Sequence, residues 1–344
     1  MNRSDTRFVA GLQNSCIYGL ALDARIIERN YANKMMIQSL LESCDSRYKS
    51  TQHCNSCSDC SYQEHCPHNC EKCLDYIHNP SHAPDNAPDR KYDCVHMADY
   101  YVCKYACRYT SEMIYALRRL IDLSHKPSLK VLSFGCGPCT DLLALDYLKQ
   151  QNEYTYSKLE YRGIDYSKEV WINIHHDLKT ISPSDTTIGF FYKDICTFID
   201  EIGEGAWIPD LVIFQYFLSD LHKHSERASV QSFLKSFAQF VDVYMPANSY
   251  IVLNDINLGA SYGGGRDYFE TLSSLLPSYS FRRGRFCNDN SQSPFYPRGY
   301  SYGEASDGEF PVNKNIFSLT QWTDYSPFRT CASAQMLLKK EVVI

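Results

Sequence analysis

The sequence has no unbroken run of about 18 apolar residues, the length that a membrane-spanning helix needs. Its first residues include the acid Asp5 and lack a long apolar core, so we expect no secretion signal. Hydrophobic residues still make up 44% of the 344 residues, which is ordinary for a globular protein with a buried core. We therefore expect a cytoplasmic protein with no membrane partner.

An excess of positive charge is also missing. Residues 1–126 carry 15 basic and 15 acidic side chains, which leaves 19 of the 34 basic and 25 of the 40 acidic residues for the remainder. The net charge is −6, and neither part is basic. This charge balance excludes strong, sequence-independent electrostatic binding to nucleic acid. A local basic patch could still exist with this net charge.

A third missing feature is the last glycine of the dinucleotide-binding pattern Gly-x-Gly-x-x-Gly. An apolar run, residues 130–134, leads into Gly135 and Gly137, but Thr140 stands where that glycine would be. An amphipathic segment follows, and a second apolar run ends at Asp165. Such glycines let the backbone approach a ligand, and such an acid accepts hydrogen bonds from a ribose. This strand-turn-helix-strand pattern predicts a site for an adenosine-containing cofactor without a pyrophosphate.

Gly135-Cys136-Gly137-Pro138 resembles the first motif of the class I S-adenosylmethionine (SAM) methyltransferases. Later segments resemble the second to fifth strands of that family in order, at residues 163–167, 190–195, 209–216 and 250–255. The resemblance covers roughly residues 127–344. It implies an α/β fold with a Rossmann-like, mostly parallel sheet, helices on both faces, and SAM as the cofactor.

The resemblance also implies residue roles. Asp165 would hold the ribose, Asp194 and Ile195 would flank the adenine, and the fourth strand would end at the transferred methyl. The implied cofactor-binding residues are Ser133, Gly135, Gly137, Asp165, Tyr166, Asp194, Ile195 and Gln215. Transfer requires a nucleophile in line with the methyl and in some cases a base. We predict Tyr216 and Asp220 as catalytic candidates.

Two features bear on the substrate. The family usually has an acid where this chain has Ser133, which leaves open a catalytically silent binding or regulatory protein. Residues 215–218, Gln-Tyr-Phe-Leu, lack the Pro-Pro motif of exocyclic-amine DNA methyltransferases and the catalytic cysteine of pyrimidine-C5 enzymes. We expect a macromolecular substrate, RNA or protein. A small-molecule methyltransferase stays an alternative.

The chain has 16 cysteines, and their clustering predicts a metal-binding module. Two-residue spacings such as Cys54/Cys57 and Cys70/Cys73 let both thiolates face one ion. A disulfide framework would not persist in a reducing compartment. We expect zinc, with an iron–sulfur cluster as the alternative. The predicted ligands are Cys54, Cys57, Cys60, Cys66, Cys70, Cys73, Cys94, Cys103 and Cys107.

These patterns divide the chain into four parts. Residues 1–50 have helical periodicity and predict a helical lead-in. Residues 51–110 form the Cys-rich module, and residues 111–126 form a linking helix. Residues 127–344 form the SAM-binding domain, in which we expect residues 259–308 to be long loops on the substrate side.

Overall fold

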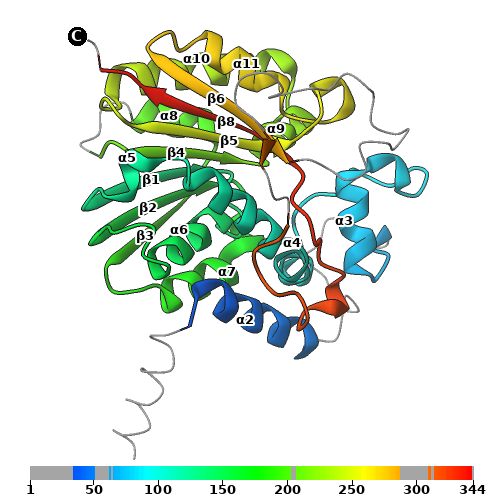
Figure 1. Ribbon diagram of the computed structural model, residues 1–344. Coiled ribbons are helices and arrows are strands. Elements are labelled where there is room, and N and C mark those ends of the chain that lie inside the picture. The colour runs from blue at the N-terminus through cyan, green and yellow to red at the C-terminus, as the bar shows by residue number, and fades with distance from the viewer. Residues whose placement is uncertain are drawn as a thin grey trace, which may run out of the picture.

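The protein is described from a computed structural model covering residues 34–50, 62, 65–202, 207–286, 309–310 and 314–342 (Figure 1). Within these residues eight strands form one sheet. They are β1 (Ser128–Phe134), β2 (Lys158–Asp165), β3 (Thr186–Tyr192), β4 (Leu211–Gln215), β5 (Tyr250–Ile256), β6 (Tyr279–Phe286), β7 (Glu309–Phe310) and β8 (Ser333–Lys340).

The strand order is β3-β2-β1-β4-β5-β8-β6-β7. Strands β1 to β5 are parallel, whereas β8 runs antiparallel to both β5 and β6. The order changes direction between β1 and β4. In open α/β sheets, ligands bind beyond the carboxyl ends of the strands at this switch point. The predicted Rossmann-like, mostly parallel sheet is confirmed.

Helices cover both faces of the sheet, also as predicted (Figure 1). One face carries α2 (Met36–Ser50), α4 (Val95–Leu117), α5 (Ile121–Ser124), α6 (Thr140–Gln150) and α7 (Lys168–Ile181). The other carries α8 (Ile195–Ile202), α9 (Phe217–His224), α10 (Arg227–Tyr244) and α11 (Asp267–Ser274). No helix among the described residues is long and apolar enough to cross a membrane.

Successive side chains along a strand point to opposite faces of the sheet, and each face has its own hydrophobic core. In β4, Leu211 and Ile213 join the core under α4 and α6, while Val212 and Phe214 join the core under α10. Burial on both faces explains why these strands are continuous apolar runs in the sequence.

The segment before the sheet packs on the same core. Helix α4 runs without a break through position 110, and α3 (Cys70–His78) lies beside it (Figure 1). Buried cysteines of this segment, among them Cys70 and Cys103, share a core cluster with Leu143 of α6. The helix predicted before the first strand thus begins earlier, at Val95. Within the predicted lead-in, the structure describes only residues 34–50, where α2 buries Met36 and Leu40.

The expectation of loops after the fifth strand was wrong over residues 260–286. This stretch contains a short 3-10 helix, η3 (Ala260–Tyr262), then α11 and β6. Tyr268, Phe269 and Leu272 fall at helical spacing and are buried, so the apolar face of α11 outweighs the Gly- and Ser-rich composition. Residues 287–308 lie outside the described part of the chain.

Candidate cofactor site

The loop after β1 depends on two glycines. Gly135 and Gly137 have φ angles of +58° and +44°, in the left-handed region that favours glycine. A Cβ on Gly135 would lie 2.5 Å from Cδ2 of Phe217, the first residue of α9. The N–H of Cys136 donates to the carbonyl of Ile164 at 3.0 Å. The loop is therefore held between β2 and α9 at the switch point.

Asp165 ends β2 directly beside this loop. Its carboxylate accepts one hydrogen bond from the N–H of Gly137 and one from the N–H of Ser167, both at 2.9 Å. Burial raises the pKa of Asp165, and these two N–H groups oppose that rise. A carboxylate has about four acceptor sites. Asp165 therefore retains capacity for a diol such as a ribose.

The remaining predicted cofactor residues lie along the same edge of the sheet. Asp194 follows β3, and its carboxylate accepts from the N–H of Thr197 at 3.2 Å, beside Ile195 at the start of α8. Tyr166 follows Asp165 and is 82% exposed. The side chain of Gln215 accepts from the Thr140 hydroxyl at 2.7 Å and donates to the Tyr109 carbonyl at 2.8 Å.

Ser133 faces a carboxylate that the sequence interpretation missed. Asp141, in the first turn of α6, is buried; burial raises its pKa, and the nearby Ser133 hydroxyl opposes that rise. The Tyr161 hydroxyl donates to the same carboxylate at 2.9 Å. A buried acid from α6 thus lies near Ser133, the position where the family usually has an acid. The sequence did place Asp141 at a helix start, but an acid there is common for its effect on the helix dipole alone.

The two catalytic candidates have different surroundings. The hydroxyl of Tyr216 donates to a carboxylate oxygen of Glu112 at 2.8 Å, and burial raises the pKa of Tyr216. The side chain of Asp220 is 48% exposed, and one of its carboxylate oxygens lies 3.6 Å from Nε2 of His224. The charge of Asp220 also raises the pKa of Asp165, so the two acids face a common region. Asp220 is the more accessible group.

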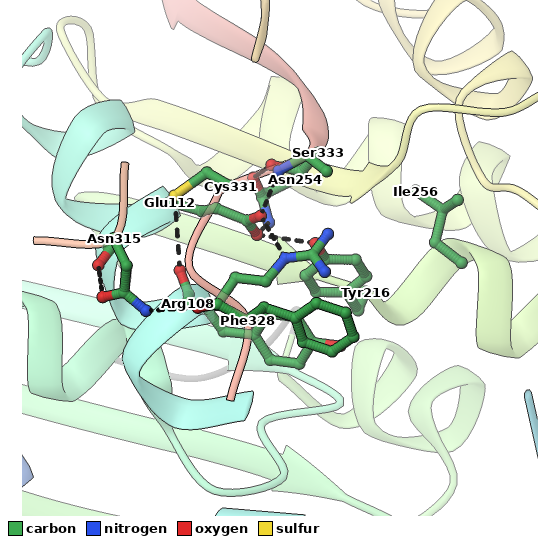
Figure 2. A network of polar contacts seen from close by, with 12 residues as sticks. Arg108, Glu112, Tyr216, Asn254, Ile256, Asn315, Phe328, Cys331 and Ser333 are labelled. Atoms are coloured by element: carbon green, nitrogen blue, oxygen red, sulfur yellow. Dashed lines mark hydrogen bonds and ion pairs between the residues drawn. The ribbon is translucent and has the colours of Figure 1, made fainter. Parts of the chain in front are cut away.

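Glu112 organises a buried polar network (Figure 2). Besides Tyr216, its carboxylate pairs with Arg108 at 3.1 Å and accepts from the Ala332 N–H at 3.0 Å and the Asn254 amide at 3.4 Å. These partners come from α4, β5 and the segment before β8. The network fixes the turn after β4, where Tyr216 has a φ of +55°.

A row of aromatic side chains, not anticipated from the sequence, lies on the α4 side of the site. It consists of Tyr92, Tyr101, Tyr105, Tyr109 and Tyr216, which we call the tyrosine row. Ring centroids are 4.8 Å apart for Tyr101 and Tyr105, 5.3 Å for Tyr105 and Tyr109, and 4.2 Å for Tyr109 and Tyr216.

The tyrosine row reaches the glycine loop through Trp171. The ring centroids of Tyr101 and Trp171 are 5.8 Å apart, and a Cβ on Gly137 would lie 3.6 Å from the Trp171 ring. The four-residue spacing of Tyr101, Tyr105 and Tyr109 was the available sequence signal, because it places them on one face of a helix.

The predicted metal ligands are only partly described. Cys54, Cys57 and Cys60 lie outside the described residues. The other six are described, and all are buried. Two lie on α3 (Cys70 and Cys73), two lie on α4 (Cys103 and Cys107), and Cys66 and Cys94 come just before these helices. Among the described residues, no three of these nine bring their sulfurs within 4.8 Å of one another. The one described group that does so consists of Cys136, Cys139 and His175.

No protein-family model matches this chain, and no curated protein matches its sequence. Solved structures that resemble it include the plantazolicin methyltransferase BpumL with S-adenosylhomocysteine (SAH) and a monoazolic desmethylPZN analogue, at 15% identity over 79% of this chain and 95% of that one, with a TM-score of 0.41. The N-methyltransferase NodS from Bradyrhizobium japonicum, in complex with SAH, matches at 14% identity over 67% and 87%, with a TM-score of 0.36. Because these identities and TM-scores are low, the similarity does not indicate the function of this protein, and the function is inferred from the site.

Proposed function

We propose that this protein is a SAM-dependent methyltransferase. The observation that carries the proposal is the hydrogen bond from the N–H of Gly137 to Asp165 at the switch point of the sheet. It joins a glycine loop, which a ligand can approach closely, to an acid with free acceptor capacity. The absence of a third glycine favours a nucleoside ligand without a pyrophosphate over a dinucleotide.

The residues at this edge fit the parts of SAM. Asp165 would bind the ribose hydroxyls, Asp194 and Ile195 would lie against the adenine, and the loop at Gly135 and Gly137 would approach the methionine part. The tyrosine row supports this placement, since aromatic faces attract a cation such as the sulfonium and exclude water. SAM supplies an already activated methyl group, so the protein needs chiefly to orient the acceptor.

Within this proposal Asp220 is the candidate base. Its carboxylate is accessible and lies on the first turn of α9, beyond the end of β4. Partial burial raises its pKa, which makes it a better proton acceptor than an ordinary surface acid. Tyr216 would position α9 and the wall of the site through Glu112, because its hydroxyl already donates to that carboxylate.

We further propose that the substrate is an RNA or a protein, engaged with the help of the Cys-rich segment. His78 of α3 lies close enough to Lys223 of α9 for that charge to lower its pKa. The segment therefore borders the side of the site that carries Asp220. We propose zinc as its metal. The described cysteines of the segment provide soft, buried sulfurs, and Cys70 and Cys73 lie on adjacent turns of α3.

Methyl transfer from isotope-labelled SAM to a cell extract tests the function directly. The extract is separated afterwards into RNA, DNA, protein and small molecules. Label in RNA or protein that disappears with Asp220→Asn supports the proposal. Label among the small molecules favours the small-molecule alternative. SAM binding without any labelled product favours a silent regulatory protein.

A further inference from the structure

Two cysteines and a histidine meet inside the glycine loop. Cys136 and Cys139 are separated by Gly137 and Pro138, and their sulfurs and a ring nitrogen of His175 lie within 4.8 Å of one another. Cys139 and His175 are almost fully buried, and Cys136 is 7% exposed. The Cys136 sulfur lies 3.9 Å from Nε2 of His175, and the Cys139 sulfur lies 3.6 Å from the carbonyl oxygen of Gly137.

The protonation of His175 argues against a metal at this place. Its Nε2 is 2.7 Å from the carbonyl oxygen of Gly137, an atom that only accepts hydrogen bonds. Nε2 therefore carries a proton and has no lone pair for an ion. Its Nδ1 lies 2.8 Å from the Tyr192 hydroxyl, which completes the ring's hydrogen bonds. Both ring nitrogens are therefore engaged, and the protonated Nε2 lies 3.9 Å from the Cys136 sulfur, beside the thiol pair.

The surroundings favour one thiolate in the pair. Cys139 is the residue that precedes α6, so it lies at the positive end of that helix. Burial opposes its ionisation, but the neighbouring Cys136 thiol and His175 ring together outweigh burial and lower the pKa of Cys139 below its ordinary value. Burial, the paired Cys139 and the acids Asp165 and Asp141 raise the pKa of Cys136. Of the two thiols, Cys139 is therefore the one that ionises first.

We propose that Cys136 and Cys139 form a reversible disulfide on reaction with a small peroxide, and that this bond controls the glycine loop. A Cys-x-x-Cys pair at the start of a helix after a strand has the layout of dithiol redox sites. Cys136 is the more accessible sulfur, so it meets the oxidant first. Hydrogen peroxide is small enough to be the oxidant at a site with so little exposure.

The chemistry balances with peroxide as the only co-reactant. The proton on Cys136 moves to the Cys139 thiolate, whose sulfur lies within 4.8 Å, and the Cys136 thiolate attacks peroxide. An S–O bond forms, the O–O bond breaks, and one water leaves after protonation. The Cys139 sulfur then attacks the Cys136 sulfenic acid, so that an S–S bond forms, the S–O bond breaks and a second water leaves. Two thiols lose two electrons and one peroxide gains them.

The bond would act on the loop that carries Gly137. The N–H of Gly137 donates to Asp165 and its carbonyl accepts from His175, so a shift of either sulfur moves both contacts. Cys136 has little free space, because a Cβ on Gly163 would lie 2.7 Å from its sulfur. We expect the oxidised protein to bind SAH at least tenfold more weakly, a consequence that rests on the proposed function.

Peptide mass spectrometry of the full chain tests the bond itself. The protein is treated with hydrogen peroxide, denatured and alkylated. We expect the peptide that contains Cys136 and Cys139 to have lost two hydrogens, to resist alkylation and to recover with a reductant. Cys331→Ala is the matched control, since Cys331 is also a buried free cysteine, and it should leave the bond intact. His175→Phe should slow bond formation on the order of tenfold through a smaller thiolate fraction.

Each outcome decides one part of the proposal. Full alkylation of both cysteines after peroxide, or irreversible oxidation of Cys136 without an S–S bond, overturns the disulfide. A disulfide that leaves SAH affinity unchanged overturns its control of the loop. A reduced protein that binds no SAH refutes the proposed function instead, while the mass-spectrometric result stands by itself. Cys139→Ser, which removes the bond with little change in volume, should bind SAH equally with and without peroxide.

Discussion

The N–H of Gly137 and the carboxylate of Asp165 are joined by a hydrogen bond of 2.9 Å. One residue lies in the loop after β1 and the other ends β2, so the bond ties together the two parts of the predicted cofactor site. It holds the loop in place before any ligand arrives. Such preorganisation reduces the ordering cost of binding.

Gly135→Ala should destabilise the protein by about 2–4 kcal/mol, because a left-handed φ and a contact with Phe217 both oppose a Cβ. Gly189→Ala is the matched control. Its Cβ would lie 3.4 Å from Phe191 and its φ is not left-handed, so the change should be under about 1 kcal/mol. Chemical denaturation measures both. Equal losses would show that the loop does not need glycine.

Tyr216→Phe should lower the free energy of unfolding by about 1–3 kcal/mol, since the buried Glu112 loses a hydrogen-bond donor. Turnover should fall less than about tenfold, whereas loss of a proton-transfer group costs about 10²–10⁴. Tyr244→Phe, at a 42% exposed position on α10, should change stability by under about 0.5 kcal/mol. A loss of turnover above a hundredfold with normal stability would assign Tyr216 to catalysis.

His78 should make stability depend on pH. Burial and the charge of Lys223 lower the pKa of His78 to about 4, below the value of about 6.5 in an unfolded chain. The unfolded chain therefore takes up a proton first as the pH falls from about 6.5 to 4, and the folded state loses stability in that window.

His78→Gln removes this dependence. As the pH falls from about 6.5 to 4, the free energy of unfolding of the parent should fall by about 1–2 kcal/mol more than that of the variant. The value is moderate because His78 is only partly buried. Above pH 7 the difference between the two should be constant. Denaturation curves at several pH values provide the measurement, and parallel pH profiles for both proteins would contradict the assigned shift.

Elemental analysis of freshly purified protein should find about two zinc ions per chain if the nine predicted cysteines form two sites. Iron with an equal amount of acid-labile sulfide would favour the iron–sulfur alternative. Folded protein that contains neither zinc nor iron would contradict the predicted metal-binding module.

The sequence was sufficient to predict the sheet through β5, because each strand is an apolar run that ends in a glycine loop, an acid or a polar turn. It was also sufficient to place Asp165 beside Gly137, since carboxyl ends of neighbouring parallel strands meet at one edge. The local pattern predicted β1 and β2, and the resemblance to SAM methyltransferases predicted β3 to β5. The meeting of the strand ends follows from a general property of α/β folds.

Contacts between distant residues could not be predicted. Glu112 lies 104 positions from Tyr216 and 220 from Ala332, and nothing in the local sequence identifies it as the centre of a buried network. The fold also buries Asp141 of α6 near Ser133, which the local sequence does not reveal. The strand β6 was missed because its three arginines among aromatic residues resemble a substrate loop as closely as a strand.

The central claim is that Asp165 and the glycine loop bind SAM. Calorimetric titration of the reduced protein with SAH tests it most directly. We predict saturable binding to the parent and a loss of about 1–3 kcal/mol in Asp165→Ala through loss of charge-assisted hydrogen bonds to the ribose. Asp194→Ala is a useful comparison, since its exposed side chain should contribute less than that of Asp165. Binding of NAD without binding of SAM or SAH, or equal SAH affinity in the parent and Asp165→Ala, would contradict the account.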